Sequence, residues 1–496
     1  YSATGDKRVI DCMTKYFRYQ LKQLPSKPLN HWSYWGKERG GDNLLMVYWL
    51  YNITGDEFLL ELGDLIYSQT VDWASIFGLR TDDLYRSLSR HTVNVAHGFK
   101  TPAIYYQRSG ERSLIEDLHR GEKTIRVTIG YPTGLWAGDE WLRYGNPIYG
   151  SELCTAVEML YSLENVLQIT GEAHWGDYIE RVAYNALPTQ VDDNCTMRQY
   201  YQQLNQIEIS QQQRAFSTPQ FCGSPQLFGL LTGYPCCTSN LHQGWPKLTQ
   251  NLWYATPDGG LAAMVYAPSS VETEVGGRKV KVVERTNYPF EESVEFEFKV
   301  SGAKSHTFPL HLRLPEWSKS VIVTVNGEAV AVTPVDGVVV LSRGWRSGDV
   351  VKVEFAADIV VNYWFDDEAD ERGEQYINRD FVGDLNVDLP DNKLSVVKFI
   401  YRNTPTNTVP GITKMVKFCE NMLWYRSLSD GNTYSGFTNG ASRLSEMLYK
   451  SGKIEEFTEF LKENGLEYKL GFEERDGEHL LMVLFNEGKT RVPFTS

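Results

Sequence analysis

The stretch YGSELCTAVEMLYSLENVLQITGEAHWGDYIERVAYNAL, residues 149–187, carries apolar residues at α-helical spacing on both sides of the tetrapeptide ITGE. A glycine that ends one helix and an acidic residue that opens the next mark a boundary between two helices. Similar punctuation, ITGD, occurs at residues 53–56 inside another apolar-periodic stretch. We therefore predict recurring helix pairs, as in a helical toroid; several long helices also fit an ordinary bundle.

Helical periodicity extends from the start of the chain through DKRVIDCMTKYFRYQLKQL and VAHGFKTPAIYYQRSG to about residue 247. From about residue 250 the apolar period changes to two, in segments such as KVVERTNYPFEESVEFEFKV and SVIVTVNGEAV, and NG and DG turns separate such segments. The sequence thus predicts a helical domain over 1–247, followed by an antiparallel β-sandwich over 248–362.

The last part of the chain does not continue the sandwich pattern. A charge run, DDEADERGE at 366–374, is typical of a solvated linker. After it we expect a short strand in KLSVVKFIYRN, two amphipathic helices around 412–426 and 440–465, and a closing hairpin in EYKLGFEERDGEHLLMVLFNEGKTRVPF. Residues 363–496 are therefore predicted to form a separate α+β segment of uncertain origin.

The bulk composition excludes some classes of partner. With 49 Lys and Arg against 63 Asp and Glu, the formal net charge of −14 argues against binding to nucleic acid or to an anionic membrane. No apolar run reaches the length of a membrane span, and no signal-peptide core stands at the start. The compartment, periplasmic or cytoplasmic in a bacterium, does not follow from the residues. The many aromatic residues suit a sugar-binding cleft and an ordinary core alike.

Two of the seven cysteines, Cys236 and Cys237, are adjacent in GYPCCTSN. Adjacent cysteines pair poorly with each other, because a disulfide needs its Cα atoms further apart. Both thiols would be useful if they faced a soft cation such as zinc. Upstream, Glu152 and Cys154 stand at the start of an amphipathic helix, where residues two apart can converge. The residues alone leave open a second reading, in which these are reduced cysteines packed in a proline-containing loop.

The motifs YGSELCTAVEM and GYPCCTSNLHQGWPKLTQNLWYATPDGGLAAMVYAPS together resemble the bacterial β-L-arabinofuranosidases of glycoside hydrolase family 127 and their relatives, over about residues 5–360. The resemblance implies a fold with an (α/α)6-type helical barrel, apparently without its first helices, followed by the β-sandwich. It also implies a zinc site whose ligands are Glu152, Cys154, Cys236 and Cys237. A purely structural zinc at this place stays an alternative.

The resemblance further implies a retaining glycosidase. In such a reaction Cys236 is the nucleophile, and Glu140 is the general acid and base, with Asp139 as a competing candidate for that role. The stretch between Glu140 and the zinc motif is shorter than is usual in the family. The expected substrate is a β-L-arabinofuranoside or a related pentose-type sugar of a plant-derived oligosaccharide or glycan.

Further sugar contacts are expected in regions where the family lines its site. His242 follows the cysteine pair and is a candidate for an outer partner of the metal or for a helix cap. The family carries a histidine-glutamate pair where this chain reads RGGDNLL at 39–45, which leaves the exact sugar open. The predicted substrate-binding residues are His97, Asn94, Tyr201, Gln203 and Asn205.

Both ends of the chain depart from the family pattern. Members of the family have further helices ahead of this start, so we expect a trimmed record, a covering partner or an inactive fragment. The tail faintly resembles the interior of AAA-type phage-defence ATPases without their nucleotide-binding loop, so we assign it no ATPase activity. A join of unrelated gene pieces near 358–370 is one hypothesis. The alternative function is that of a non-catalytic carbohydrate-binding or scaffold protein. We expect a homodimer as one possible assembly.

Overall fold

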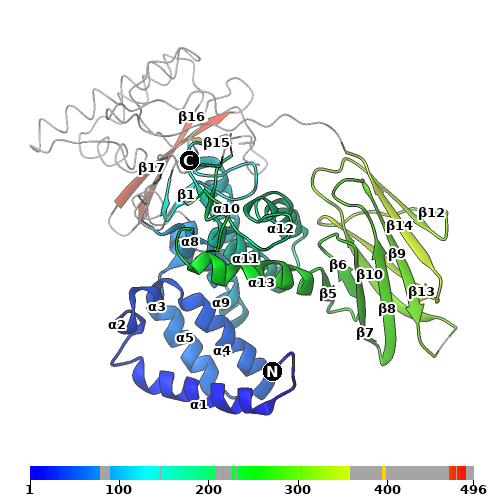
Figure 1. Ribbon diagram of the computed structural model, residues 1–496, viewed down its shortest axis with the longest axis horizontal. Coiled ribbons are helices and arrows are strands. Elements are labelled where there is room, and N and C mark those ends of the chain that lie inside the picture. Colours follow the sequence, from blue (N-terminus) through cyan, green and yellow to red (C-terminus); the bar gives the residue numbers. More distant parts are fainter. Residues whose placement is uncertain are drawn as a thin grey trace, which may run out of the picture.

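The computed structural model describes residues 1–78 and 90–357, apart from 144, 146, 205, 207–208, 211–215, 217–225, 231 and 303, together with the backbone of three later strands. Helices predominate from Lys7 to Gln250, and a β-sandwich follows (Figure 1). The predicted order of a helical domain and then a sandwich is therefore confirmed. Among the described residues, no helix combines the length and the apolar character needed to cross a bilayer.

The punctuation predicted between helices is present in the structure. Gly55 ends α4 with φ of +70° and Gly171 ends α11 with φ of +69°, in the left-handed region that glycine adopts most easily. Each of these helices is followed by a second helix, which makes the pairs α4–α5 and α11–α12. The helices are α1 (Lys7–Gln23), α2 (Leu29–Trp32), α3 (Tyr34–Glu38), α4 (Gly40–Thr54), α5 (Phe58–Gln69), α6 (Trp73–Phe77), α8 (Thr92–Phe99), α9 (Thr101–Ser109), α10 (Ser113–Thr128), α11 (Leu153–Thr170), α12 (Ala173–Asn185), the 3₁₀ turn Pro188–Gln190, and α13 (Cys236–Gln250).

A small four-stranded sheet lies among the helices, in the order β2-β1-β3-β4. It consists of β1 (Gly138–Asp139), β2 (Trp141–Leu142), β3 (Ser151–Glu152) and β4 (Tyr201–Gln202). The strand β3 leads directly into α11, so a residue of the sheet and the first turn of a buried helix adjoin. Sequence periodicity did not indicate this sheet, because strands of two residues carry no alternating pattern.

The sandwich packs two sheets of different size. One has the order β13-β10-β6-β5, and the other has the order β12-β11-β14-β9-β8-β7. The pairing is antiparallel except between β6 and β10, which run parallel because the chain visits the other sheet between them. The strands are β5 (Trp253–Ala255), β6 (Leu261–Ala263), β7 (Ser269–Val275), β8 (Arg278–Arg285), β9 (Ser293–Val300), β10 (His306–Arg313), β11 (Val321–Val325), β12 (Glu328–Val330), β13 (Val338–Trp345) and β14 (Val350–Phe355).

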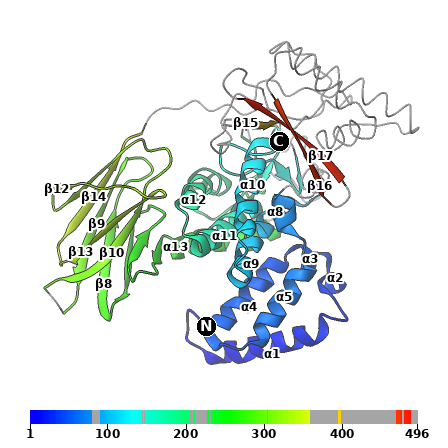
Figure 2. The same ribbon diagram turned by 180° about the vertical axis from the view of Figure 1, so that it is seen from behind.

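The sandwich lies beside α12 and α13, on the side away from α1 to α5 (Figures 1 and 2). Arg313 of β10 is fully buried where the two parts meet. Its guanidinium contacts Asp177 of α12 at 2.6 Å, pairs with Glu180, and donates to the carbonyl of Met264 at 2.7 Å. A buried guanidinium needs such partners, so this group fixes the sandwich against α12.

Three strands are described beyond the sandwich: β15 (Leu394–Val397), β16 (Tyr468–Arg475) and β17 (Glu478–Asn486). The strands β16 and β17 form the predicted antiparallel hairpin, and β15 pairs with β17. The predicted helices around 412–426 and 440–465 lie outside the described residues, as does the proposed join near 358–370. The resemblance of this segment to an ATPase stays a prediction.

Candidate active site

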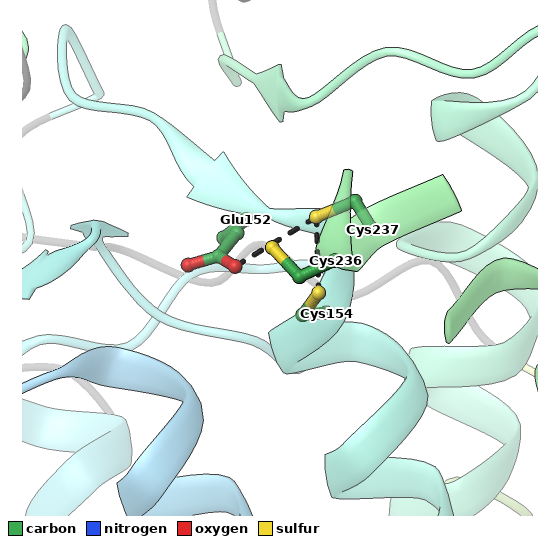
Figure 3. Close-up of side chains that lie close together, drawn as sticks. All are labelled: Glu152, Cys154, Cys236 and Cys237. Atoms are coloured by element: carbon green, nitrogen blue, oxygen red, sulfur yellow. Dashed lines mark hydrogen bonds between the residues drawn. The ribbon is translucent and has the colours of Figure 1, made fainter. Parts of the chain in front are cut away.

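Two helix starts and a strand end bring the four predicted ligands together. Glu152 is the last residue of β3, and Cys154 lies in the first turn of α11. Cys236 and Cys237 are the first two residues of α13, which packs against α11. Figure 3 shows the four side chains pointing toward one another from these elements. The first turns of two long helices therefore face the cluster, and their unpaired N–H groups favour negative charge there.

The turn that leads into α13 has little room for change. Gly233 has φ of +69°, and a Cβ at this position would lie 2.3 Å from the ring of Tyr200. Pro235 follows and precedes the first helical residue, Cys236. The motif GYPCC thus holds the cysteine pair against Tyr200, because only glycine allows this close approach.

The spacing of the donor atoms suits one metal ion. One ligand atom from each of the four residues lies within 4.8 Å of the others. The sulfurs of Cys154 and Cys237 are 3.1 Å apart, and the sulfur of Cys237 is 3.7 Å from Oε1 of Glu152. Tetrahedral zinc with Zn–S bonds near 2.3 Å separates its sulfurs by about 3.8 Å, which is longer than the first value and close to the second. All four side chains are therefore within reach of a common centre.

The buried charges of this cluster also call for a cation. The Oε2 atom of Glu152 is buried and has no hydrogen-bond partner among the residues that the structure describes. Burial, with the nearby Glu140 and Cys236, raises the pKa of Glu152. Hydrogen bonding to Cys236 raises the pKa of Cys154, and burial raises the pKa of Cys237. Without a counter-charge these groups favour their protonated forms, whereas a bound divalent cation would favour ionisation.

Cys236 differs from the other three ligands in its environment. It is exposed, whereas Cys154 and Cys237 are buried. Hydrogen bonds from Cys154 and Cys237 lower the pKa of Cys236, although burial opposes the shift. The cluster therefore concentrates its negative charge on the one sulfur that small molecules can reach, which is the condition for a nucleophilic thiolate.

A cavity of about 880 Å³ opens in front of Cys236. This volume suits a sugar or a small oligosaccharide. Glu140 lines the same cavity, while Asp139 is fully buried and is not part of the lining. Other side chains of the lining are Trp35, Arg39, His91, His97, Trp141 and Gln243.

Glu140 is held firmly at the tip of the turn between β1 and β2. Its backbone has φ of +80°, which is strained for a residue other than glycine. One carboxylate oxygen is 2.9 Å from Nε2 of His91, and the other accepts hydrogen bonds from the hydroxyls of Tyr200 and Tyr201, the latter at 3.0 Å. A carboxylate fixed in this way is oriented for proton transfer to a molecule in the cavity.

Tyr200 connects the two candidate catalytic groups. Its hydroxyl donates to Glu140 and lies 3.6 Å from the sulfur of Cys236. Burial, followed by the charge of Glu152, raises the pKa of Tyr200 far above its ordinary value, so the hydroxyl keeps its proton. The sequence reasoning named Tyr201 and missed Tyr200, although the two are adjacent in the same motif.

The other predicted sugar contacts take different positions. His97 lines the cavity, whereas Asn94 is buried and accepts from Nε of Arg39 at 2.9 Å. Gln203 does not line the cavity; it donates to the carbonyl of Ile148 and accepts from Gln226 at 2.5 Å. Asn205 lies outside the described residues, and His242 is exposed on α13 away from the lining.

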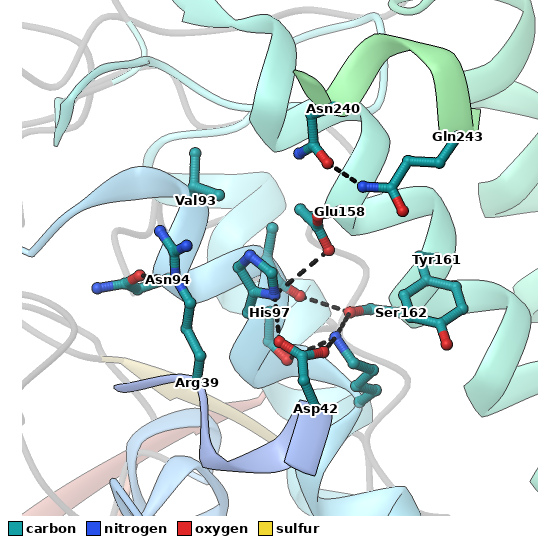
Figure 4. A network of polar contacts seen from close by, with 12 residues as sticks. Arg39, Asp42, Val93, Asn94, His97, Glu158, Tyr161, Ser162, Asn240 and Gln243 are labelled. Carbon is teal, nitrogen blue, oxygen red and sulfur yellow. Dashed lines mark hydrogen bonds and ion pairs between the residues drawn. The ribbon is translucent and has the colours of Figure 1, made fainter. Parts of the chain in front are cut away.

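A charged network lies behind His97 (Figure 4). Nδ1 of His97 is 2.7 Å from Asp42 and 3.3 Å from Glu158. Asp42 also contacts the fully buried ammonium of Lys100 at 2.7 Å. Although burial opposes its charge, Lys100 and His97 hold the pKa of Asp42 below its usual range. Asp42 belongs to the segment RGGDNLL, so the departure noted there places a carboxylate against a residue of the cavity wall.

Two family models match the chain. Residues 1–250 match the model of the β-L-arabinofuranosidase GH127 catalytic domain, and residues 260–357 match that of the GH127 middle domain. No curated protein matched the chain.

Solved structures show the same fold. Ara127N-Se, a GH127 β-L-arabinofuranosidase from Geobacillus stearothermophilus T6, is 21% identical, with 72% of this chain and 59% of that chain covered and a TM-score of 0.56. The GH127 β-arabinofuranosidase BT3674 is 21% identical, with 72% and 57% covered and a TM-score of 0.53. A third structure, described as a glycoside hydrolase, is 19% identical, with 71% and 61% covered and a TM-score of 0.55. The chain spans less than two thirds of the length of each of these structures.

Proposed function

Since the chain belongs to glycoside hydrolase family 127, we propose that it is a zinc-dependent, retaining glycoside hydrolase with a cysteine nucleophile. Its substrate would be a β-L-arabinofuranoside or a related pentose-type sugar of a plant-derived glycan. The observation that carries the proposal is the position of Cys236, which is exposed and lines the same cavity as Glu140, whereas the other three ligands are buried.

The residues of the cluster fit zinc. Three thiols and one carboxylate form a donor set that zinc prefers, and Oε1 of Glu152 faces the sulfur of Cys237. When bound, zinc would keep the sulfurs as thiolates and neutralise the charge that burial otherwise disfavours. The ligands would be Glu152, Cys154, Cys236 and Cys237.

The first step of the reaction breaks the glycosidic bond. The thiolate of Cys236 attacks the anomeric carbon and forms a C–S bond, while Glu140 in its protonated form gives its proton to the leaving oxygen. Because one hydroxyl, that of Tyr200, contacts both groups, they are no further apart than two hydrogen bonds. This limit allows the separation of about 5–5.5 Å that the two carboxyl groups of ordinary retaining glycosidases have.

The second step releases the sugar. Glu140, now ionised, takes a proton from water, and the resulting hydroxide displaces the sulfur of Cys236 from the anomeric carbon. The contacts of His91 and Tyr201 with Glu140 hold the carboxylate in place through both steps. Two displacements at one carbon retain its configuration.

We also propose the finer architecture that the sequence predicted. The helices over 1–247 would belong to an (α/α)6-type barrel, the sandwich would span 248–362, and 363–496 would be a separate segment. The net charge of −14 supports a substrate without phosphate and argues against nucleic acid and anionic membranes as partners. The homodimer stays a prediction.

The proposal is tested by metal analysis together with hydrolysis of aryl β-L-arabinofuranosides and pectin-derived oligosaccharides. We expect zinc in the purified chain, hydrolysis by the wild type, and no measurable hydrolysis by Cys236→Ala. Cys12→Ala is the matched control, because Cys12 is an exposed free cysteine on α1. Two results together would instead establish the carbohydrate-binding alternative. The wild type would release no product, and the Cys236→Ala variant would still bind the sugar.

A further inference from the structure

A second group of metal-ligating side chains lies outside the candidate active site. His119 and Glu122 are one turn apart on the same face of α10, and His174 stands at the start of α12. One nitrogen of each histidine and one oxygen of Glu122 lie within 4.8 Å of one another. Two imidazoles and a carboxylate are a ligand set that zinc accepts, with a further position left for water.

Each histidine of this group has a carboxylate on one of its ring nitrogens. Oε2 of Glu172 is 2.8 Å from Nε2 of His119, and Oε1 of Glu316 is 2.5 Å from Nδ1 of His174. Glu172 is itself fixed by Trp175, whose indole N–H donates to it at 2.9 Å. Metal-bound histidines usually donate their second N–H to such a carboxylate, which sets the tautomer and leaves the other nitrogen for the metal.

The second ring nitrogens of the two histidines have different surroundings. Nε2 of His174 is 2.8 Å from Glu122, so a proton on His174 could satisfy both Glu122 and Glu316. The contact of His119 with Glu172 uses Nε2, and its Nδ1 has no hydrogen bond among the described residues. The side chain of His119 is 40% exposed, so water or a cation can reach that nitrogen.

We propose that His119, Glu122 and His174 bind a divalent metal ion of the zinc type, with Glu172 and Glu316 orienting the two histidines. A cavity of about 30 Å³ beside Glu122 and His174 has room for a water.

The metal would link the helical part to the sandwich. Glu316 follows β10 in the sandwich, whereas the three ligands lie on α10 and α12. Arg126 and Arg181 line the same small cavity, and their charge opposes a cation, so the three ligands must outweigh that repulsion. The affinity of the three residues for a divalent cation therefore shows whether the ligands outweigh the repulsion.

The test is a Co²⁺ titration of the metal-depleted full chain. Cobalt bound by the cysteine cluster gives an intense thiolate-to-cobalt charge-transfer band, whereas cobalt bound by nitrogen and oxygen gives only weak visible bands. We expect two equivalents to bind, one with the intense band and one without it. His119→Gln and His174→Gln should lose the second equivalent and keep the first, whose band also shows that the variant is folded.

Two further variants sharpen the result. Glu172→Gln, which leaves all three ligands in place, should weaken the second equivalent about 10- to 100-fold. His31→Gln, an exposed histidine on α2, should change neither equivalent. The inference is overturned if the wild type binds no cobalt beyond the thiolate band, or if His119→Gln binds as much as the wild type. A missing thiolate band with the second equivalent intact would contradict the proposed function and leave this inference standing.

Discussion

Replacing Tyr200 by phenylalanine tests the contact that joins the two proposed catalytic groups. The substitution removes one hydroxyl and leaves the ring that packs against Gly233. That hydroxyl donates to Glu140 and lies 3.6 Å from the sulfur of Cys236. Both partners change their charge during the reaction, so the contact matters most in the transition states.

The size of the effect follows from these contacts. A hydrogen bond to a charged group stabilises by about 1.5–3 kcal/mol. If Tyr200→Phe loses one such bond in the first transition state, kcat/KM falls about 10- to 150-fold, at about 1.4 kcal/mol per factor of ten. Unfolding midpoints of the variant and the wild type show whether the loss is confined to catalysis.

Tyr201→Phe is the matched control. Its hydroxyl donates to the same oxygen of Glu140 at 3.0 Å, but the tyrosine hydroxyl that contacts the sulfur of Cys236 belongs to Tyr200. We compare kcat/KM for aryl glycosides with a good and a poor leaving group, because a good one needs little help from the acid. Tyr201→Phe should lose activity mainly on the poor leaving group, and Tyr200→Phe on both.

Two results would refute this reasoning. One is a Tyr200→Phe enzyme with wild-type kcat/KM on both substrates. The other is a larger loss in Tyr201→Phe than in Tyr200→Phe on the good leaving group, because the sulfur would then not depend on Tyr200.

Three further substitutions test the supporting structure. Gly233→Ala should lower the free energy of unfolding by about 2–4 kcal/mol and abolish most activity, because the added Cβ would overlap the ring of Tyr200. Gly259 also has a positive φ but has open space around it, so Gly259→Ala should lower the free energy of unfolding by only about 1 kcal/mol. Asp42→Asn should cost about 1–3 kcal/mol in urea unfolding at pH 7, since the buried Lys100 loses its counter-charge while Asp42 itself is partly exposed. The folded pKa of Asp42 is lowered, so this advantage of the wild type is complete above about pH 4 and disappears as the pH falls further. An unchanged stability at pH 7 would contradict this prediction. Burial raises the pKa of Glu284 to about 8, so the wild type should lose stability as the pH rises from about 4.5 to 8. At pH 8, Glu284→Gln should therefore be more stable than the wild type by about 1–3 kcal/mol. Equal stability of the two proteins at that pH would disprove this.

The sequence predicted those parts of the fold that carry a regular pattern. The helix boundaries at Gly55 and Gly171 and the alternating strands of the sandwich could be recognised because one glycine conformation or one period determines each. The strands β1 to β4 have two residues each, so no alternating pattern indicates them, and β3 pairs with strands that are distant in the sequence. Yet this small sheet positions both Glu140 and Glu152.

The candidate site was predictable to a similar extent. The pair Cys236–Cys237 is conspicuous in the sequence, and the resemblance of two motifs linked it to Glu152 and Cys154. The bridging role of Tyr200 depends on the turn at Gly233, which no spacing encodes. Asp42 and Lys100 lie behind the cavity through helix packing, so only coordinates show that they pair.

The central claim is that the sulfur of Cys236 forms a bond to the sugar, and trapping that bond tests it most directly. Glu140→Gln, incubated with an arabinofuranoside that carries a good leaving group, should complete the first step and stall before the second. Mass spectrometry of the intact chain and its peptides should then show one added pentose, on the peptide that contains Cys236. A pentose on any other residue, or no adduct while the wild type turns the same substrate over, would contradict the account.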